Sequence, residues 1–148
     1  MEIIIFTGIQ ATGKSEFFKR RFYNTHVRIN LDMLKTRNRE NILINACLEA
    51  KQPFAVDNTN PTATDRKKYI DLAKNKRFKI IGYYFESIVN KAVERNESRS
   101  GKAKVPVNAI YATKSKLELP AYNEGFDELY YVKIKDNDFI VEDYTNEI

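Results

Sequence analysis

The chain has 148 residues, with 25 Lys and Arg against 20 Asp and Glu, one Cys, one His and 43% hydrophobic residues. This composition predicts one folded domain, taken as residues 1–148, and excludes a disordered chain, an intramolecular disulfide and a Cys/His zinc site. The absence of an apolar run of about 18 residues and of a signal-peptide pattern predicts a cytoplasmic protein with no membrane partner.

Short apolar runs alternate with longer amphipathic segments along the chain. In chain order, we expect a strand over 3–7, a helix over 14–23, a strand over 27–30, a helix over 31–50 and a strand over 54–57. A capped helix over about 62–76, a strand over 78–85, a helix over 87–98, a short helix from Pro106 and a strand over 127–134 follow. The segment 138–144 fits a small helix or an added strand. The expected apolar positions of 31–50 are Leu34, Ile42, Leu43, Ala46, Cys47 and Ala50.

This alternation predicts an α/β fold, in which right-handed crossovers build a three-layer αβα sandwich around a mostly parallel sheet of about five strands. A small helical lid is expected over about 95–117. In such sheets the ligand binds beyond the carboxyl ends of the strands. The polar segments 8–15, 30–35 and 57–60 all follow predicted strands, so we expect them to lie at one edge of the sheet.

The segment 8–15 fits the pattern G-x-x-x-x-G-K-[ST] between a predicted strand and a predicted helix, which is the context of a phosphate-binding loop, the Walker A motif or P-loop. Its glycines let backbone N–H groups face phosphate oxygens, and the helix N-terminus adds partial positive charge. Lys14 is expected between the β- and γ-phosphates and Ser15 on Mg²⁺. We therefore predict a P-loop NTPase-type fold that binds ATP and Mg²⁺ through Gly8, Ile9, Gln10, Ala11, Thr12, Gly13, Lys14, Ser15 and Glu16.

A small kinase also needs a base for the acceptor hydroxyl and an acid near Mg²⁺. Asp32 follows the second strand and is a candidate base, with Lys35 one turn further to hold a phosphate; the alternative is that Asn30 or Asp32 only caps a helix. Asp57 ends an apolar strand and is a candidate for Mg²⁺ through water, whereas the alternative for the 57–61 segment is an ordinary turn.

Two arginines, Arg95 and Arg99, lie four residues apart on one predicted helical face, next to the pair Ser100 and Gly101. Mobile arginines stabilise the charge of a phosphoryl group during transfer, and a nearby glycine suits a closing lid. The alternative is a solvated basic end of a helix.

Taken together, these segments resemble the 5′-kinase domain of polynucleotide kinases, the end-healing enzymes that phosphorylate a 5′-hydroxyl of DNA or RNA. The resemblance rests on the P-loop, Asn30-x-Asp32-x-x-Lys35, the 57–61 run with Arg66, Arg95-Asn96 with Arg99 and Val105-Pro106, and the 124–128 run.

What the resemblance implies is ATP-dependent phosphoryl transfer, with Asp32 at the place of the general base. Lys35 takes the place of an arginine that holds the phosphate next to the acceptor nucleoside, and Arg99 and Arg95 that of lid arginines. The substrate-binding residues expected on this basis are Asp32, Lys35, Asp57, Asn58, Thr59, Asn60 and Arg66.

The charge is uneven, because residues 1–117 carry 23 basic and 11 acidic side chains and the remainder carries 2 and 9. A basic body suits a polyanionic partner, although such charge also forms ordinary solvated faces. The leading hypothesis is therefore a kinase of polynucleotide 5′-hydroxyl ends, with any partner domain acting in trans. The alternatives are a kinase of a small hydroxyl acceptor (a nucleoside, sugar, antibiotic or nucleotide-sugar) and a nucleotide-binding module without transfer activity. The oligomeric state is not fixed by these patterns.

Overall fold

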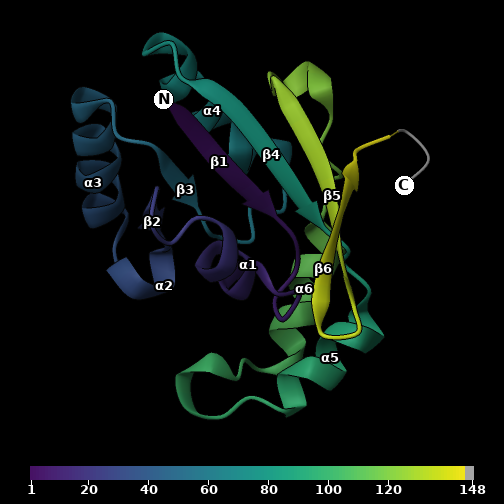
Figure 1. Ribbon diagram of the computed structural model, residues 1–148. Helices are drawn as coiled ribbons and strands as arrows, with labels where there is room; N and C mark the ends of the chain where they lie inside the picture. Colours follow the sequence, from purple (N-terminus) through teal and green to yellow (C-terminus); the bar gives the residue numbers. More distant parts are fainter. Residues whose placement is uncertain (146–148) are drawn as a thin grey trace.

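In the computed structural model, which describes residues 1–145, the chain forms a sheet in the order β2-β3-β1-β4-β5-β6 (Figure 1). Five strands are parallel and β6 runs antiparallel to β5. The predicted, mostly parallel sheet is confirmed, and of the two alternatives for 138–144 the added strand is confirmed, because 138–143 pairs with β5 as a sixth strand. The strands are β1 (Glu2–Thr7), β2 (Val27–Ile29), β3 (Phe54–Val56), β4 (Lys79–Phe85), β5 (Glu128–Lys135) and β6 (Asp138–Asp143).

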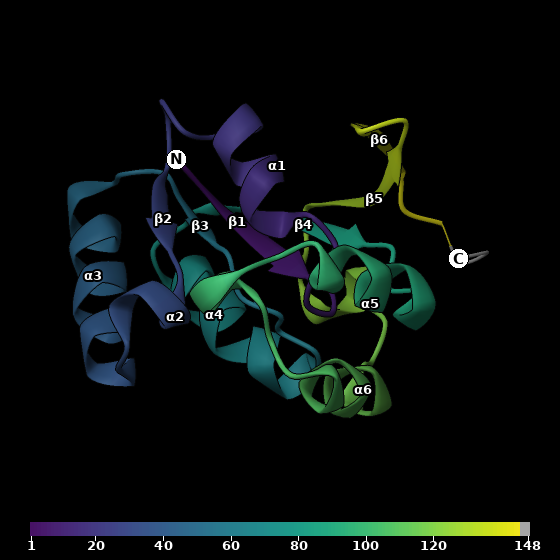
Figure 2. The ribbon, with the colours of Figure 1, turned by 90° about the horizontal axis from the view of Figure 1, so that it is seen from below.

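Helices cover both faces of the sheet, as Figure 2 shows: α1 (Lys14–Arg21) lies on one face, and α3 (Arg37–Ala50) and α4 (Ala63–Asn75) lie on the other. Alternate residues of β1 point to opposite layers. Ile4 and Phe6 join the core under α1, whereas Ile3 and Ile5 join the core under α3 and α4. On α1 the three predicted apolar positions are all buried, namely Phe17, Phe18 and Phe22. The predicted αβα layers are confirmed.

The single helix predicted over 31–50 is wrong, because the structure divides it into α2 (Leu31–Leu34) and α3. Lys35 has a φ of 75° and a ψ of −36°, a backbone conformation that ends α2, and the Thr36 side chain accepts a hydrogen bond from the Arg39 N–H to cap α3. Of the apolar positions predicted for this helix, Cys47 is buried, whereas Ile42, Ala46 and Ala50 are exposed. The buried residues of α3 are Glu40, Ile44, Cys47 and Leu48.

Beyond the carboxyl end of the sheet lie α5 (Val89–Glu97) and α6 (Val107–Lys116), with a 3₁₀ turn over Gly101–Ala103 between them (Figure 1). A second 3₁₀ turn spans Tyr122–Glu124. The P-loop residues Ile9 and Ala11 share a small apolar core with Ala92 of α5 and Ile110 of α6. The predicted lid, residues 95–117, therefore packs on the P-loop through Ile110. Among the described residues, no helix has the length and apolarity needed to cross a membrane.

Candidate active site

The P-loop joins β1 to α1, and two of its positions accept only glycine. A Cβ added at Gly8 would lie 2.9 Å from the Cβ of Phe85. Gly13 has a φ of 91°, and a Cβ there would lie 2.8 Å from a ring carbon of Phe139. Both distances are shorter than packed side chains allow, and the φ of Gly13 is strained for other residues. The glycine spacing of the motif is therefore also a packing requirement of this fold.

Other predicted P-loop residues hold the loop in shape. The Thr12 hydroxyl donates to the Ile9 carbonyl over 2.8 Å, and the Ile9 N–H donates to the Ser87 hydroxyl over 3.1 Å. Gln10 donates from its side chain to Thr113 of α6 over 2.9 Å. Glu16 faces solvent on α1 and forms an ion pair with Arg20. These contacts tie the loop to β4 and to the lid.

Lys14 is the buried charge at the centre of the site. Its Nζ donates to the carbonyls of Gly8 and Ile9 over 3.0 and 2.7 Å. Burial lowers the pKa of Lys14 to about 8, while the negative charges of Asp57 and Asp32 raise it and the positive charge of Arg99 lowers it further. Asp32, Asp57 and Arg99, which were predicted from separate segments, therefore all lie close enough to influence the charge of Lys14.

Ser15 and Asp57 form the candidate metal position. The Ser15 Oγ donates to Asp57 Oδ2 over 2.9 Å. Arg28 of β2 also contacts the pair, with Nε 2.8 Å from Asp57 Oδ2 and a terminal nitrogen 2.9 Å from Ser15 Oγ. The Ser15 hydroxyl and the Asp57 carboxylate offer oxygen atoms at a place where the positively charged Arg28 side chain already binds. These groups fit Mg²⁺, which is usually bound by one or two protein oxygens together with substrate phosphates.

Arg28 was missed by the sequence predictions. The available signal was its place in a short strand, where Val27 and Ile29 face one side of the sheet and Arg28 faces the side that carries α1. Its partner Asp57 lies 29 positions away, so the contact itself had no local signature.

Asp32 lies on α2, where it is exposed. The cap of this helix is Asn30, whose side-chain oxygen accepts a hydrogen bond from the Met33 N–H over 2.9 Å. Of the two capping alternatives, the one for Asn30 is confirmed and the one for Asp32 is wrong. Lys35 follows with a positive φ of 75° and an exposed side chain. The Asp32 carboxylate is therefore free of the capping role and accessible to an acceptor.

The loop after β3 is held firmly against the P-loop. Thr59 accepts the Gly8 N–H through its backbone carbonyl over 3.0 Å. Asn60 is buried with a φ of 42°, and its side chain donates to the Phe6 carbonyl over 2.8 Å. Arg66 is fully buried and donates to the Asn60 carbonyl over 2.9 Å. The expectation that Asn60 and Arg66 contact the acceptor is corrected, because both side chains are enclosed and support the loop.

Arg66 also forms a two-point ion pair with Glu124, over 2.8 and 3.1 Å. Removing one partner of a buried pair leaves an uncompensated charge. We expect Arg66→Met to lower the free energy of unfolding by about 3 kcal/mol or more, and Lys67→Met, in an exposed pair on the same helix, by less than about 1 kcal/mol. Urea denaturation measures both, and equal losses would contradict the assignment of Arg66.

The lid arginines point to different partners. Arg95 donates to the carbonyl of Ala11 in the P-loop over 3.2 Å. Arg99 lies beyond the end of α5, not on its face as predicted, and donates to the Ala103 carbonyl over 3.2 Å. Between them Asn96 is buried and pairs with both backbone groups of Val105, over 2.7 and 3.0 Å. Arg95 thus contacts the P-loop, and Asn96 closes the turn that carries Arg99.

The sequence is similar to two proteins named as polynucleotide phosphatase/kinases. No protein-family model matches it. The chain is 30% identical over 141 residues to the bifunctional polynucleotide phosphatase/kinase of Schizosaccharomyces pombe, an alignment that covers 90% of the chain and 34% of that protein. A relative from Acanthamoeba polyphaga mimivirus is 30% identical over 135 residues, which cover 86% of the chain and 32% of the relative. The chain therefore spans about a third of the length of these relatives.

Solved structures share the architecture. Kti12 of Chaetomium thermophilum, solved in complex with ADP-AlF3, superposes with a TM-score of 0.68 at 17% identity and 90% coverage of both chains. A gluconokinase of Sinorhizobium meliloti 1021 superposes with a TM-score of 0.62 at 17% identity, covering 89% of this chain and 82% of the other. The chain has the fold of the P-loop kinases. Within this P-loop kinase fold, the predicted resemblance to polynucleotide kinases is confirmed by the alignment over most of the chain.

Proposed function

We propose that this chain is an ATP-dependent phosphotransferase that moves the γ-phosphate to the 5′-hydroxyl of a polynucleotide. The observation that carries the proposal is the geometry of the P-loop, where Lys14 donates to the Gly8 and Ile9 carbonyls and Ser15 donates to Asp57. A nucleotide-binding module has no need of an accessible carboxylate and a lid arginine beside its P-loop. The kinase activity named for the yeast relative, which aligns over most of this chain, supports the same reaction.

In the proposed reaction, Lys14 exchanges its bonds to the Gly8 and Ile9 carbonyls for phosphate oxygens. Ser15 and Asp57 would hold Mg²⁺, which when bound neutralises charge on the β- and γ-phosphate oxygens. The acceptor oxygen forms a bond to the γ-phosphorus while the bond from that phosphorus to the β–γ bridging oxygen breaks, and ADP leaves. Asp32 takes the hydroxyl proton, and Arg99 stabilises the transferring group.

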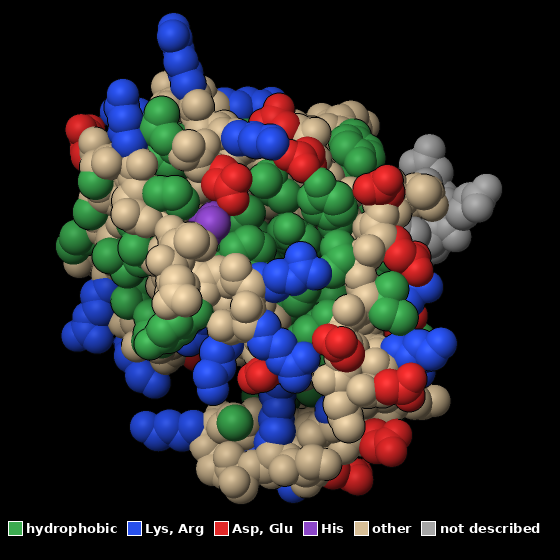
Figure 3. Space-filling model, viewed as in Figure 1, with side chains coloured by type: hydrophobic (Ala, Val, Ile, Leu, Met, Phe, Trp, Pro, Cys, Tyr) green, Lys and Arg blue, Asp and Glu red, His purple; other side chains and the backbone are tan. Residues whose placement is uncertain are grey.

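The charge on the active-site side of the molecule supports a polyanionic acceptor. Figure 3 shows Lys and Arg side chains gathered in the lower half of the face on which Figure 1 places α1, α2 and the lid. Three basic residues lie close to the site: Arg28 of β2 contacts Asp57 and Ser15, and Lys35 at the end of α2 and Arg39 of α3 are exposed. Arg39 donates to the Leu34 carbonyl over 3.2 Å at the end of α2. A basic surface of this kind favours a phosphate backbone next to the hydroxyl acceptor.

Affinity for a single-stranded oligonucleotide with a 5′-hydroxyl is expected to fall steeply with salt. Each phosphate that is neutralised releases counterions, which gives a log–log slope of about −0.7 per contact on single strands. Fluorescence anisotropy with a labelled oligonucleotide between low and high KCl measures this slope. A flat dependence, with transfer retained, would favour the small-acceptor kinase.

The small-acceptor alternative is supported by a different observation, because the gluconokinase named above shares the fold.

An acceptor panel separates the two hypotheses. Equal concentrations of a 5′-hydroxyl oligonucleotide, the corresponding nucleoside, a sugar and a nucleotide-sugar are incubated with γ-labelled ATP, and the labelled product is identified. The proposal predicts that the oligonucleotide has the highest kcat/KM. A higher kcat/KM for one of the small acceptors would replace it, and nucleotide binding without transfer to any acceptor would favour the binding module.

A further inference from the structure

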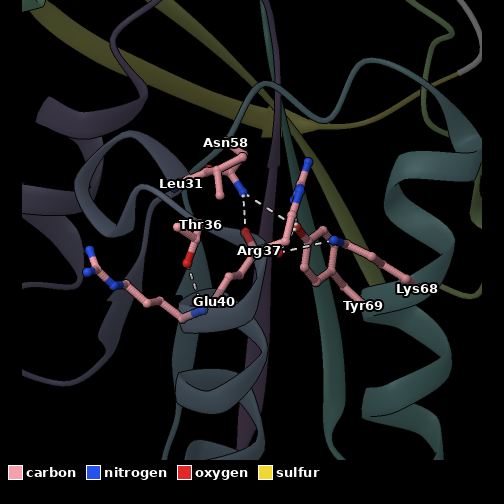
Figure 4. Close-up of polar contacts among 8 residues, drawn as sticks. Leu31, Thr36, Arg37, Glu40, Asn58, Lys68 and Tyr69 are labelled. Carbon is pink, nitrogen blue, oxygen red and sulfur yellow. Dashed lines mark hydrogen bonds and ion pairs between the residues drawn. The ribbon is translucent and has the colours of Figure 1, made fainter.

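A fully buried carboxylate, Glu40 of α3, lies at the junction of three segments and has no part in the reaction described above. Figure 4 shows the side chains that converge on it. Its Oε1 accepts hydrogen bonds from Arg37 over 3.0 Å, from Lys68 over 3.1 Å and from the Tyr69 hydroxyl over 3.0 Å. Its Oε2 accepts a hydrogen bond from the Asn58 side-chain nitrogen over 3.2 Å. The two oxygens therefore face different parts of the structure.

The cluster is built for a charged carboxylate. Burial disfavours ionisation of Glu40, but hydrogen bonds from Lys68, Arg37 and Tyr69 outweigh it and keep the pKa of Glu40 below its ordinary value. Every group that contacts the carboxylate in this cluster is a donor. An amide in its place would bring its own N–H groups against donors.

Asn58 continues the chain of contacts toward the reaction. Its side-chain oxygen accepts the backbone N–H of Leu31 over 2.9 Å, at the first residue of α2. A helix of four residues does not hold its own position in water, because the cost of helix nucleation is not recovered over one turn. The place of Asp32, one residue further, therefore depends on the groups that anchor this turn.

We propose that Glu40 is a positioning residue for phosphoryl transfer, which sets the place of the Asp32 carboxylate through Asn58 and the Leu31 N–H. This inference rests on the proposed function, because it concerns the acceptor side of the same site. Asn30 provides a second anchor by donating from its side chain to the Asp57 carbonyl over 2.6 Å. Together, the two asparagines tie α2 to the end of β3, and Glu40 fixes one of them.

A role in stability alone does not account for this arrangement. Buried ion pairs are often replaced by apolar residues with no loss of stability, so a purely structural core at this position has no need of a carboxylate. The oxygen Oε1 is sufficient to join α3 to α4 through Lys68 and Tyr69. The oxygen Oε2 contacts the loop that holds the start of α2, which is the part of the arrangement that concerns catalysis.

Kinetics with matched variants test the link. Glu40→Gln and Asn58→Ala are each expected to lower kcat/KM for the acceptor about 10-fold, the change that follows from losing one hydrogen bond to a charged group, with ADP affinity unchanged. The double variant should be no worse than Asn58→Ala, because both changes break one pathway. Lys67→Met, on the same helix but in an exposed pair with Asp71, is the control and is expected to keep wild-type transfer. Additive effects in the double variant, or an equal loss of ADP affinity, would overturn the proposal.

Amide hydrogen exchange followed by NMR gives a readout that does not depend on activity. In Glu40→Gln the amides of residues 31–35 should exchange faster than in the wild-type protein, while those of β1 stay protected. If the Gln variant does not fold, the same exchange measurement is made on Glu40→Asp, whose charged carboxylate lies one methylene further from Asn58. Unchanged exchange over 31–35 together with a lower free energy of unfolding would show that Glu40 only stabilises the fold. If the wild-type protein transfers no phosphate, the proposed function fails, and the exchange result still decides whether Glu40 positions α2.

Discussion

Asp32→Asn is expected to lower phosphoryl transfer by roughly 10²–10⁴ while leaving nucleotide binding nearly unchanged. Asn keeps the size of the side chain but does not take a proton from the acceptor hydroxyl. In the proposed reaction the nucleotide is held by Lys14 and by the P-loop backbone, which the substitution leaves intact. The helix cap is also preserved, because Asn30 provides it. The substitution thus separates the chemical step from folding and from binding.

Two measurements on Asp32→Asn check this result: ADP affinity by isothermal titration calorimetry, and transfer in a single turnover with γ-labelled ATP. Asp71→Asn is a matched control, because Asp71 is an exposed acid on α4 whose partner is Lys67. The control is expected to match the wild-type protein in both measurements. Unimpaired transfer in Asp32→Asn would show that another group acts as the base.

Lys14→Ala is expected to lower transfer by about 100-fold or more and to weaken ATP binding, because it removes the cation that faces the transferring phosphate. Lys14 is the P-loop residue on which Asp32, Asp57 and Arg99 all act electrostatically. Replacing Lys14 therefore removes the positive charge on which these three residues act. Lys14 also donates to the carbonyls of Gly8 and Ile9, so the loop loses two hydrogen bonds.

Lys19→Ala, on the exposed side of α1, is the control for Lys14→Ala. Circular dichroism and urea denaturation show whether each variant is folded before its rate is interpreted. Steady-state transfer is then measured over a range of ATP concentrations. A folded Lys14→Ala protein with wild-type turnover would remove the basis for a P-loop kinase.

The parts of the fold that were predicted from the sequence are those with a local signature. β1, the P-loop and α1 follow from an apolar run, two glycines at fixed spacing and three phenylalanines on one helical face. The positions of Asp32 and Asp57 at one edge of the sheet follow from the rule that parallel strands share a carboxyl end.

The parts that were missed depend on partners that are far away in the sequence. Arg66 looks like a free basic residue on a polar helix, and its burial follows from Glu124, which lies 58 positions later. The break between α2 and α3 lies at Lys35, which has a positive φ although lysine ordinarily continues a helix. Glu40 looks like a solvated charge until α4 and Asn58 surround it. Tertiary contacts overrode the local pattern at Arg66 and Glu40.

The most direct test of the proposed reaction compares two oligonucleotides that differ only at the 5′ end. The wild-type protein is incubated with Mg²⁺, γ-labelled ATP and a single-stranded oligonucleotide that carries either a 5′-hydroxyl or a 5′-phosphate, and both the labelled oligonucleotide and ADP are quantified. The proposal predicts label at the 5′ end of the hydroxyl strand, one ADP for each label, and no label on the phosphorylated strand. ADP formed at the same rate with both strands, with no labelled oligonucleotide, would contradict it.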